Sequence, residues 1–193
     1  MASFKIHTPD NAPEQSRPML KELQARLGFV PNIFGALAES PTVLRAWLGL
    51  KTTAETGLLS PTERKIVGLT ASYLNNCSYC IAAGTTIGEK EGVSREVLDL
   101  LRADKPLKDA KHEQLRQFTK SVMKRLGRPD KTDIDAVIKA GYTQAHILEV
   151  VMLVSFGIMG NYINHIVETP LDKAFEPNCF EERKVSVRMS DAA

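Results

Sequence analysis

The sequence is poor in the features that mark several large classes of protein. Only three of its 193 residues are cysteine and one is tryptophan. Three cysteines are too few for the disulfide framework of a small secreted domain. Neither sign of charge dominates, because the chain has 25 basic and 23 acidic residues, and no run of Lys or Arg reaches five positions. These counts argue against a nucleic-acid partner.

Signals for export or for a membrane are also missing. The first residues, Met1 to Asp10, are polar and lack the apolar core of a signal peptide. The most apolar region, Ile147 to Met159, is short for a membrane span and carries Glu149, so we expect a buried core helix there. We therefore expect a cytoplasmic protein with no membrane partner. In that compartment, a C-x-x-C pair is more often catalytic, redox-active or metal-binding than structural.

The sequence has almost no alternating pattern typical of β-strands, and the longest such stretch is Lys184 to Arg188. It predicts an all-α fold of eight or nine helices in a single domain, 1–193. A polar N-terminal arm, about 1–17, and a C-terminal tail, about 177–193, are expected to flank the helices. The predicted helices are about 18–27, 33–39, 41–56, 61–74, 77–91, 95–105, 109–126, 133–140 and 144–167.

Capping residues set most of these boundaries. Ser60, Pro61 and Glu63 form a capping-box signature, which predicts that a helix begins at Pro61. Thr132 and Thr143 are expected to cap the last two helices. Asn76 is expected to be the N-cap of the helix that follows.

Two of the three cysteines, Cys77 and Cys80, are two residues apart at the start of this predicted helix. The unpaired N–H groups at a helix N-terminus carry partial positive charge, which favours a thiolate and lowers the thiol pKa. The pair can close into a disulfide, or one sulfur can react while the other resolves the product. This spacing therefore indicates reversible thiol chemistry.

Two structural interpretations of the cysteine pair compete with redox chemistry. Cysteine is among the most buried residue types, so both cysteines could be small core residues. A zinc site is the second alternative, but structural zinc takes four ligands. The remaining cysteine is Cys179, and no His pair lies at ligand spacing.

The chain resembles the AhpD-like, carboxymuconolactone decarboxylase superfamily, and more narrowly its peroxidase-related group. Five separated blocks in the same order carry the resemblance, which covers most of the chain. They are Gly28 to Phe34, Ser40-Pro41, Leu59 to Arg64, Asn75 to Cys80, and Asn161 to His165 with Glu168 to Asp172.

The resemblance implies a helical homo-oligomer, commonly trimeric or hexameric, with no metal or organic cofactor. In redox-active members, a C-x-x-C pair reduces hydroperoxides or passes electrons to a partner thiol protein. By that analogy Cys80 is the attacking thiolate and Cys77 resolves its sulfenic acid. The expected partners are a small hydroperoxide or disulfide substrate and a thiol electron-donor protein.

The chain departs from the family at the proton relay. The family's relay Glu and His fall at positions that are Lys65 and Gly84 here, and Tyr79 takes the place of a further His. Lys65 could lower a thiol pKa by its charge, although a solvated surface Lys is the commoner case. His165 could replace the missing base, although a lone His has many structural uses.

Three functions follow as hypotheses. The first is a thiol-dependent antioxidant oxidoreductase, a peroxide or disulfide reductase with Cys77, Cys80, Lys65 and His165 as candidate catalytic residues. The second is a lyase of the carboxymuconolactone decarboxylase kind, for which the chain offers few general bases. The third is a non-catalytic oligomer that keeps the fold.

Overall fold

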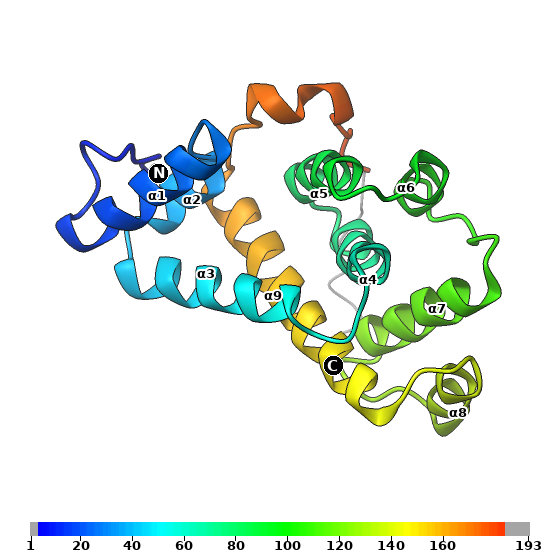
Figure 1. The fold of residues 1–193 in the computed structure, drawn as a ribbon. Coiled ribbons are helices and arrows are strands. Elements are labelled where there is room, and N and C mark those ends of the chain that lie inside the picture. Colours follow the sequence, from blue (N-terminus) through cyan, green and yellow to red (C-terminus); the bar gives the residue numbers. More distant parts are fainter. Residues whose placement is uncertain (1–3, 184–193) are drawn as a thin grey trace, which may run out of the picture.

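A computed structural model describes residues 4–183, and over these residues the protein is entirely helical, without a β-strand (Figure 1). The predicted fold class is therefore confirmed. Short 3₁₀-helices lie at Glu14–Ser16 and Lys173–Asn178. The α-helices are α1 (Arg17–Leu27), α2 (Asn32–Leu37), α3 (Pro41–Glu55), α4 (Pro61–Leu74), α5 (Ser78–Lys90), α6 (Arg95–Arg102), α7 (Ala110–Lys124), α8 (Lys131–Lys139) and α9 (Gln144–Val167).

The strongest capping signal is confirmed at α4. The Ser60 hydroxyl accepts a hydrogen bond from the Glu63 amide at 3.3 Å, and the Glu63 carboxylate accepts one from the Ser60 amide at 2.9 Å. Two N–H groups that the helix itself cannot satisfy thereby gain partners. The first turn of α4 is therefore fixed by local sequence.

Two other boundaries were predicted wrongly. The N-cap of α8 is Asp130 and not Thr132, because the Asp133 carboxylate accepts a hydrogen bond from the Asp130 amide at 3.3 Å, so that α8 begins at Lys131. α6 ends at Arg102 and not near residue 105.

The loop after α3 contacts Glu149, a residue far from it in the sequence. The Glu149 carboxylate accepts hydrogen bonds from the amides of Leu58, at 2.8 and 2.9 Å, and Leu59, at 3.1 Å. A Cβ at Gly57 would lie 2.7 Å from a Glu149 oxygen. The acidic residue in the apolar α9 segment therefore ties α9 to the α3–α4 loop.

α4 lies at the centre of the molecule and packs against α5, α7 and α9. In Figure 1, α1, α2 and α3 gather on one side, α6, α7 and α8 lie on the other, and α9 runs between the two groups. The buried apolar residues form two clusters that follow this division. One is built mainly from α4, α6, α7, α8 and α9, and the other joins α1, α2 and α3 to the start of α5, including Cys77 and Tyr79.

The two ends of the chain are more ordered than the sequence predicted. Within the expected N-terminal arm, His7, Ala12 and Ser16 are buried, and the Ser16 hydroxyl donates to the Ala38 carbonyl at 2.7 Å. Regular structure continues beyond the last predicted helix, because the 3₁₀-helix Lys173–Asn178 buries Phe175 against the second cluster. The rest of the expected tail, 184–193, with its alternating stretch, lies outside the described residues.

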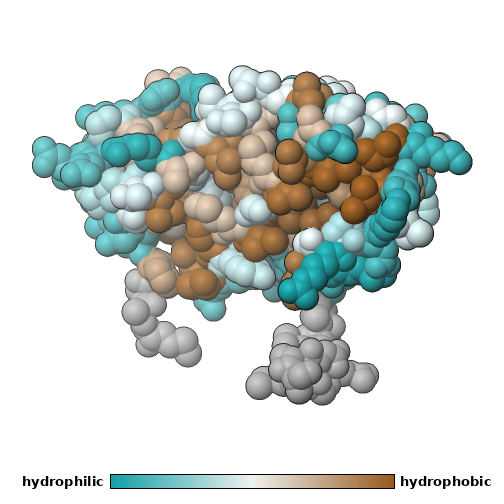
Figure 2. All heavy atoms as spheres, turned by 90° about the horizontal axis from the view of Figure 1, so that it is seen from below, coloured by the Kyte–Doolittle hydropathy of each residue, from teal (hydrophilic) through white to brown (hydrophobic). Residues whose placement is uncertain are grey.

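α9 is more exposed than the expected core helix. Val150, Leu153 and Val154 are buried. Leu148, Val151, Tyr162 and Ile166 are instead exposed by 44% to 71%, and Figure 2 shows apolar residues in a broad band across the face seen from below. At 24 residues α9 is long and apolar enough for a membrane span by length and composition, a test that helices of soluble proteins also pass.

Candidate functional site

Cys77 itself caps the cysteine helix, and the prediction that Asn76 would do so was wrong. Asn76 has a left-handed backbone with φ of 55°. The Cys77 amide donates to the Ser72 carbonyl at 3.0 Å, which closes the end of α4. The Cys77 sulfur then accepts a hydrogen bond from the Cys80 amide at 3.3 Å. This geometry puts Cys80 in the first turn of α5, close to the unpaired N–H groups of the helix N-terminus.

Two asparagines on α9 complete the surroundings of the sulfurs. The Asn164 amide donates to the Cys80 sulfur at 3.1 Å and lies 3.9 Å from the Cys77 sulfur. Asn161 is held by Asn75, which donates to its side-chain oxygen at 2.8 Å, and itself donates to the Ser72 hydroxyl at 3.2 Å. Both α9 asparagines are more than nine-tenths buried. The α9 side chains thus present hydrogen-bond donors to the cysteine pair.

These contacts push the two thiol pKa values apart. The hydrogen bond between the two sulfurs lowers the pKa of Cys80, and the amides of Asn161 and Asn164 and the Ser72 hydroxyl lower it further, against the opposing effect of burial. The same sulfur–sulfur hydrogen bond, reinforced by burial, raises the pKa of Cys77 far above its ordinary value. A hydrogen bond to an anion stabilises the ionised form. The site therefore favours a thiolate at Cys80 and a protonated thiol at Cys77.

The two cysteines also differ in their surroundings. Cys80 is partly exposed and, like Trp47, Leu48 and Ala83, packs against the second apolar cluster. Cys77 is only 1% exposed. It lines a polar cavity of about 790 Å³ between the start of α5, the end of α9 and residues 182–183.

His165 lies at this cavity, as do Asn164 and Glu168. Its side chain is exposed, and it makes no hydrogen bond to either cysteine among the described residues. The structure therefore brings His165 to the side of Cys77, the thiol that retains its proton, and not to the side of Cys80.

Lys65 is not brought to the cysteines. Its ammonium lies 3.2 Å from the Glu91 carboxylate, just past the C-terminal end of α5, and its stem packs beside Gly88. The cysteines stand at the other end of this helix of 13 residues, about 16 Å away at 1.5 Å per residue. Burial lowers the pKa of Lys65. Its place thus suits an ion pair between α4 and α5.

At the second relay position, Gly84, the Leu69 side chain of α4 occupies the space that a side chain would take. A Cβ at Gly84 would lie 2.9 Å from the Leu69 side chain of α4, closer than side chains approach one another. A larger residue at this position would require Leu69 to move. Lys65 and Gly84 therefore both fit an α4–α5 interface that packs without the Glu and His of the family relay.

Tyr79 joins the cysteine helix to two other parts of the chain. Its hydroxyl donates to the Asp172 carboxylate at 2.6 Å and accepts a weak hydrogen bond from the Ile33 amide at 3.4 Å. Asp172 also accepts from the Asn32 amide at 3.0 Å, at the first turn of α2. Burial raises the pKa of Asp172 and, together with that carboxylate, of Tyr79.

No role was predicted for Asn161, Asn164 or Asp172, although they stand in the blocks that carry the family resemblance. A usable signal was present, because Asn161 and Asn164 are polar, lie three residues apart and share one face of an apolar helix. Such residues need partners when buried. Only the packing of α9 on α4 and α5 shows that the partners are Ser72 and Asn75 for Asn161 and Cys80 for Asn164.

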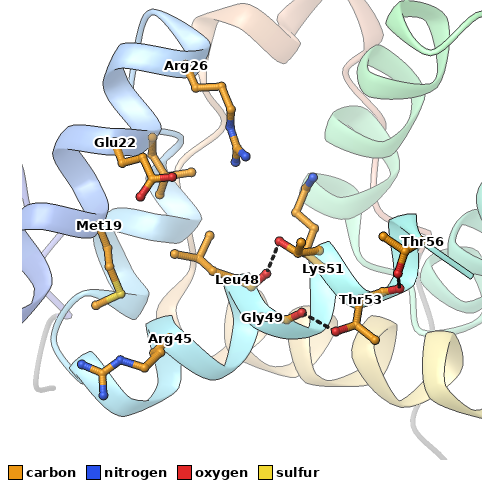
Figure 3. A pocket seen from close by; sticks show the side chains of 11 residues that line it. Met19, Glu22, Arg26, Arg45, Leu48, Gly49, Lys51, Thr53 and Thr56 are labelled. Atoms are coloured by element: carbon orange, nitrogen blue, oxygen red, sulfur yellow. Dashed lines mark hydrogen bonds between the residues drawn. The ribbon is translucent and has the colours of Figure 1, made fainter.

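A second hollow lies between α1 and α3, away from the cysteines (Figure 3). It has a volume of about 570 Å³, and Arg26, Arg45, Lys51 and Glu22 stand around an apolar floor that includes Leu48. No cysteine lines it. No group of three or more His, Cys, Asp or Glu side chains suited to a metal ion occurs in residues 4–183.

Comparison with known proteins agrees with the fold. Residues 41–107 match the carboxymuconolactone decarboxylase family. This segment runs from α3 to the end of α6 and includes both cysteines. None of the curated proteins matches the chain.

Several solved structures have the same fold at low sequence identity. The AhpD core of an uncharacterised peroxidase-related protein from Ralstonia eutropha JMP134 superposes with a TM-score of 0.80 at 21% identity, covering 91% of this chain and 96% of that one. A peroxidase-related protein from Silicibacter sp. TM1040 gives 0.76 at 20%, covering 86% and 89%. A variant of the debrominase Bmp8 in complex with 2,3,4-tribromopyrrole gives 0.76 at 16%, covering 92% and 96%. The chain thus shares its fold with these AhpD-like, peroxidase-related structures, and its residues 41–107 match the carboxymuconolactone decarboxylase family.

Proposed function

We propose that the protein is a thiol-dependent oxidoreductase that reduces a hydroperoxide or a disulfide through Cys80 and Cys77. The observation that carries the proposal is the unequal setting of two adjacent sulfurs: Cys80 accepts a hydrogen bond from the Asn164 amide at 3.1 Å, while Cys77 is buried beside it. This setting lowers the pKa of Cys80 and raises that of Cys77. An attacking sulfur must be ionised, and a resolving sulfur must be close and able to lose its proton later. The family fold supports a peroxidase-related or antioxidant type of function.

The reaction with a hydroperoxide follows from these states. The Cys80 thiolate attacks the outer oxygen, the O–O bond breaks, and the alkoxide leaves as an alcohol after taking up a proton, so that Cys80 becomes a sulfenic acid. Cys77 then loses its proton and attacks the Cys80 sulfur, forming a disulfide and releasing water. A dithiol donor, which we propose to be a thiol protein, supplies two electrons and restores both thiols.

Each neighbour has a role in this sequence. Asn164 donates to the Cys80 thiolate and holds it in place. His165, which lines the cavity with Cys77, is the proposed acceptor of the Cys77 proton during resolution. Lys65 has no direct part, because it is paired with Glu91 at the far end of α5.

The decisive experiment measures hydroperoxide consumption with excess dithiothreitol in the wild type, Cys80→Ser and Cys77→Ser. We expect turnover that is lost in Cys80→Ser, and a sulfenic acid that accumulates on Cys80 in Cys77→Ser. The substrate panel should include a brominated pyrrole, because a debrominase shares the fold. No turnover and no oxidation at Cys80 by mass spectrometry would contradict the proposal.

The same experiment separates the alternatives. A lyase would keep its activity on a lactone acid after both cysteines are changed to Ser. A non-catalytic protein would show a stoichiometric thiol-to-disulfide change without turnover of any substrate. The cysteine variants therefore decide between three classes of function.

We further propose that the protein is a cytoplasmic homo-oligomer. The exposed apolar residues of α9, Leu148, Val151, Tyr162 and Ile166, recur at helical spacing and so lie along one side of the helix. Contiguous exposed apolar surface of this kind is typical of an interface between subunits. The stripe ends beside His165, so a second subunit would lie next to the cysteine cavity.

A further inference from the structure

The last described residues of the chain, 178–183, run from Thr86 and Glu89 in the second half of α5 to Ser78 at its cysteine end, and we call this segment the strap. We propose that the strap is a gate that selects by size what reaches Cys77: small molecules enter the cavity when it is closed, and a protein thiol reaches Cys77 only when residues 182–183 lift. The purpose of the gate rests on the proposed redox function, but the gate itself can be tested without turnover.

The root of the strap is firmly anchored. Asn178 is buried, and its amide donates to the Thr86 hydroxyl at 3.1 Å and to the Glu89 carboxylate at 2.9 Å. The Arg102 guanidinium donates to the carbonyls of Asn178 and Cys179, both at 2.9 Å. Several hydrogen bonds on buried or half-buried groups therefore hold residues 178–179 against α5 and α6.

The tip of the strap is held by exposed contacts. Glu182 accepts a hydrogen bond from the Ser78 hydroxyl at 3.0 Å. The backbone of Arg183 bonds the Asn76 side chain twice, at 2.9 and 3.0 Å, and its guanidinium stacks 3.9 Å from the centre of the Tyr73 ring. Water competes for exposed hydrogen bonds, so such segments open locally at low free-energy cost. The strap can open at its tip while its root stays in place.

The tip also lies where a gate would act. Glu182 and Arg183 line the same cavity as Cys77, and Ser78 and Asn76, the residues that hold them, flank Cys77 in the sequence. Cys77 is 1% exposed with the strap in this position. A cavity of about 790 Å³ admits a small molecule but not the surface of a protein. A donor protein that attacks the Cys77 sulfur therefore has to displace the tip.

The test compares the double variant Glu182→Ala, Arg183→Ala with the control Glu181→Ala. Glu181 is an adjacent exposed glutamate without a hydrogen bond or ion pair among the described residues. Each is made in a Cys80→Ser, Cys179→Ser background, so that Cys77 is the reacting thiol. The rates of its alkylation by iodoacetamide and by a maleimide with a long polyethylene glycol chain are measured, and circular dichroism checks that each variant is folded.

We expect the ratio of the alkylation rate with the long-chain maleimide to the rate with iodoacetamide to rise about tenfold in the double variant, equivalent to about 1.4 kcal/mol. In Glu181→Ala the ratio should stay unchanged. A ratio that is equal in the two variants overturns the gate, including the case in which both rates rise together. This result is independent of peroxide turnover, because failure of the redox proposal leaves the alkylation ratio intact.

Discussion

The Asn164 side chain on α9 donates to the Cys80 sulfur on α5 at 3.1 Å, across 84 residues of sequence. Asn164 is buried, and its own side-chain oxygen has no partner among the described residues. Because this oxygen can still accept a hydrogen bond, Asn164 can also bind a ligand that donates one beside the sulfur. This contact makes Asn164 a residue that both tunes the nucleophile and faces the reacting centre.

Asn164→Ala is expected to slow alkylation of Cys80 at neutral pH about three- to tenfold, the effect of one lost charge-assisted hydrogen bond. The rate is measured by iodoacetamide labelling and mass spectrometry. Gln144→Ala, an exposed change at the far end of the same helix, is the control and should leave the rate unchanged. An Asn164→Ala rate equal to the wild type would show that the amide does not stabilise the thiolate.

The alkylation rate of Cys80 should reach half its plateau below the ordinary thiol pKa of about 8.5, because hydrogen bonds from Cys77 and the α9 amides lower the Cys80 pKa. A group whose pKa falls on folding gains stability as the pH rises from its folded toward its unfolded pKa. In concentrated urea, where the chain is unfolded, the pH at which the alkylation rate is half its plateau should be higher than in the folded protein. Equal midpoints in the folded and unfolded chain would exclude a stabilised thiolate.

Tyr79→Phe is expected to lower the free energy of unfolding by about 1–3 kcal/mol, because the buried Asp172 carboxylate loses its 2.6 Å partner. Urea titration followed by circular dichroism measures the change. Tyr73→Phe is the matched control, since the Tyr73 hydroxyl makes no hydrogen bond among the described residues. Equal losses in the two variants would mean that the Tyr79 hydroxyl contributes nothing to stability.

Gly160→Ala is expected to destabilise the protein by about 1–3 kcal/mol through overpacking. A Cβ at Gly160 would lie 2.5 Å from the Trp47 ring, which has to shift away from Phe156 and α9. Thermal unfolding gives the loss, and the emission of Trp47, the sole tryptophan, reports the shift. Gly49→Ala is the control, because a Cβ there meets no atom within 4 Å.

Ile166→Glu is expected to reduce the oligomer to a smaller species, since it puts a charge in the exposed apolar stripe of α9. Light scattering coupled to gel filtration gives the mass. Glu168→Gln, just past the end of α9, serves as a control that changes charge outside the stripe. A wild-type protein that is already monomeric would contradict the proposed oligomer.

Local signals in the sequence were enough to predict the helices. Ser60 and Glu63 fix the start of α4 within a few residues, and the spacing of apolar residues separates helix from strand without tertiary information. Errors arose where two caps competed, as at Asp130 and Thr132, or where a residue was satisfied at long range. Glu149, for example, binds amides about ninety residues away.

The sequence by itself determined that Cys77 and Cys80 begin a helix, because C-x-x-C spacing and helix capping are local properties. Only the tertiary structure showed which groups besides Cys77 lower the pKa of Cys80, since Asn164 and Ser72 arrive from other helices. It also placed Lys65 with Glu91 and His165 with Cys77. The electrostatic balance at a buried sulfur depends on atoms a few ångströms away, whatever their distance along the chain.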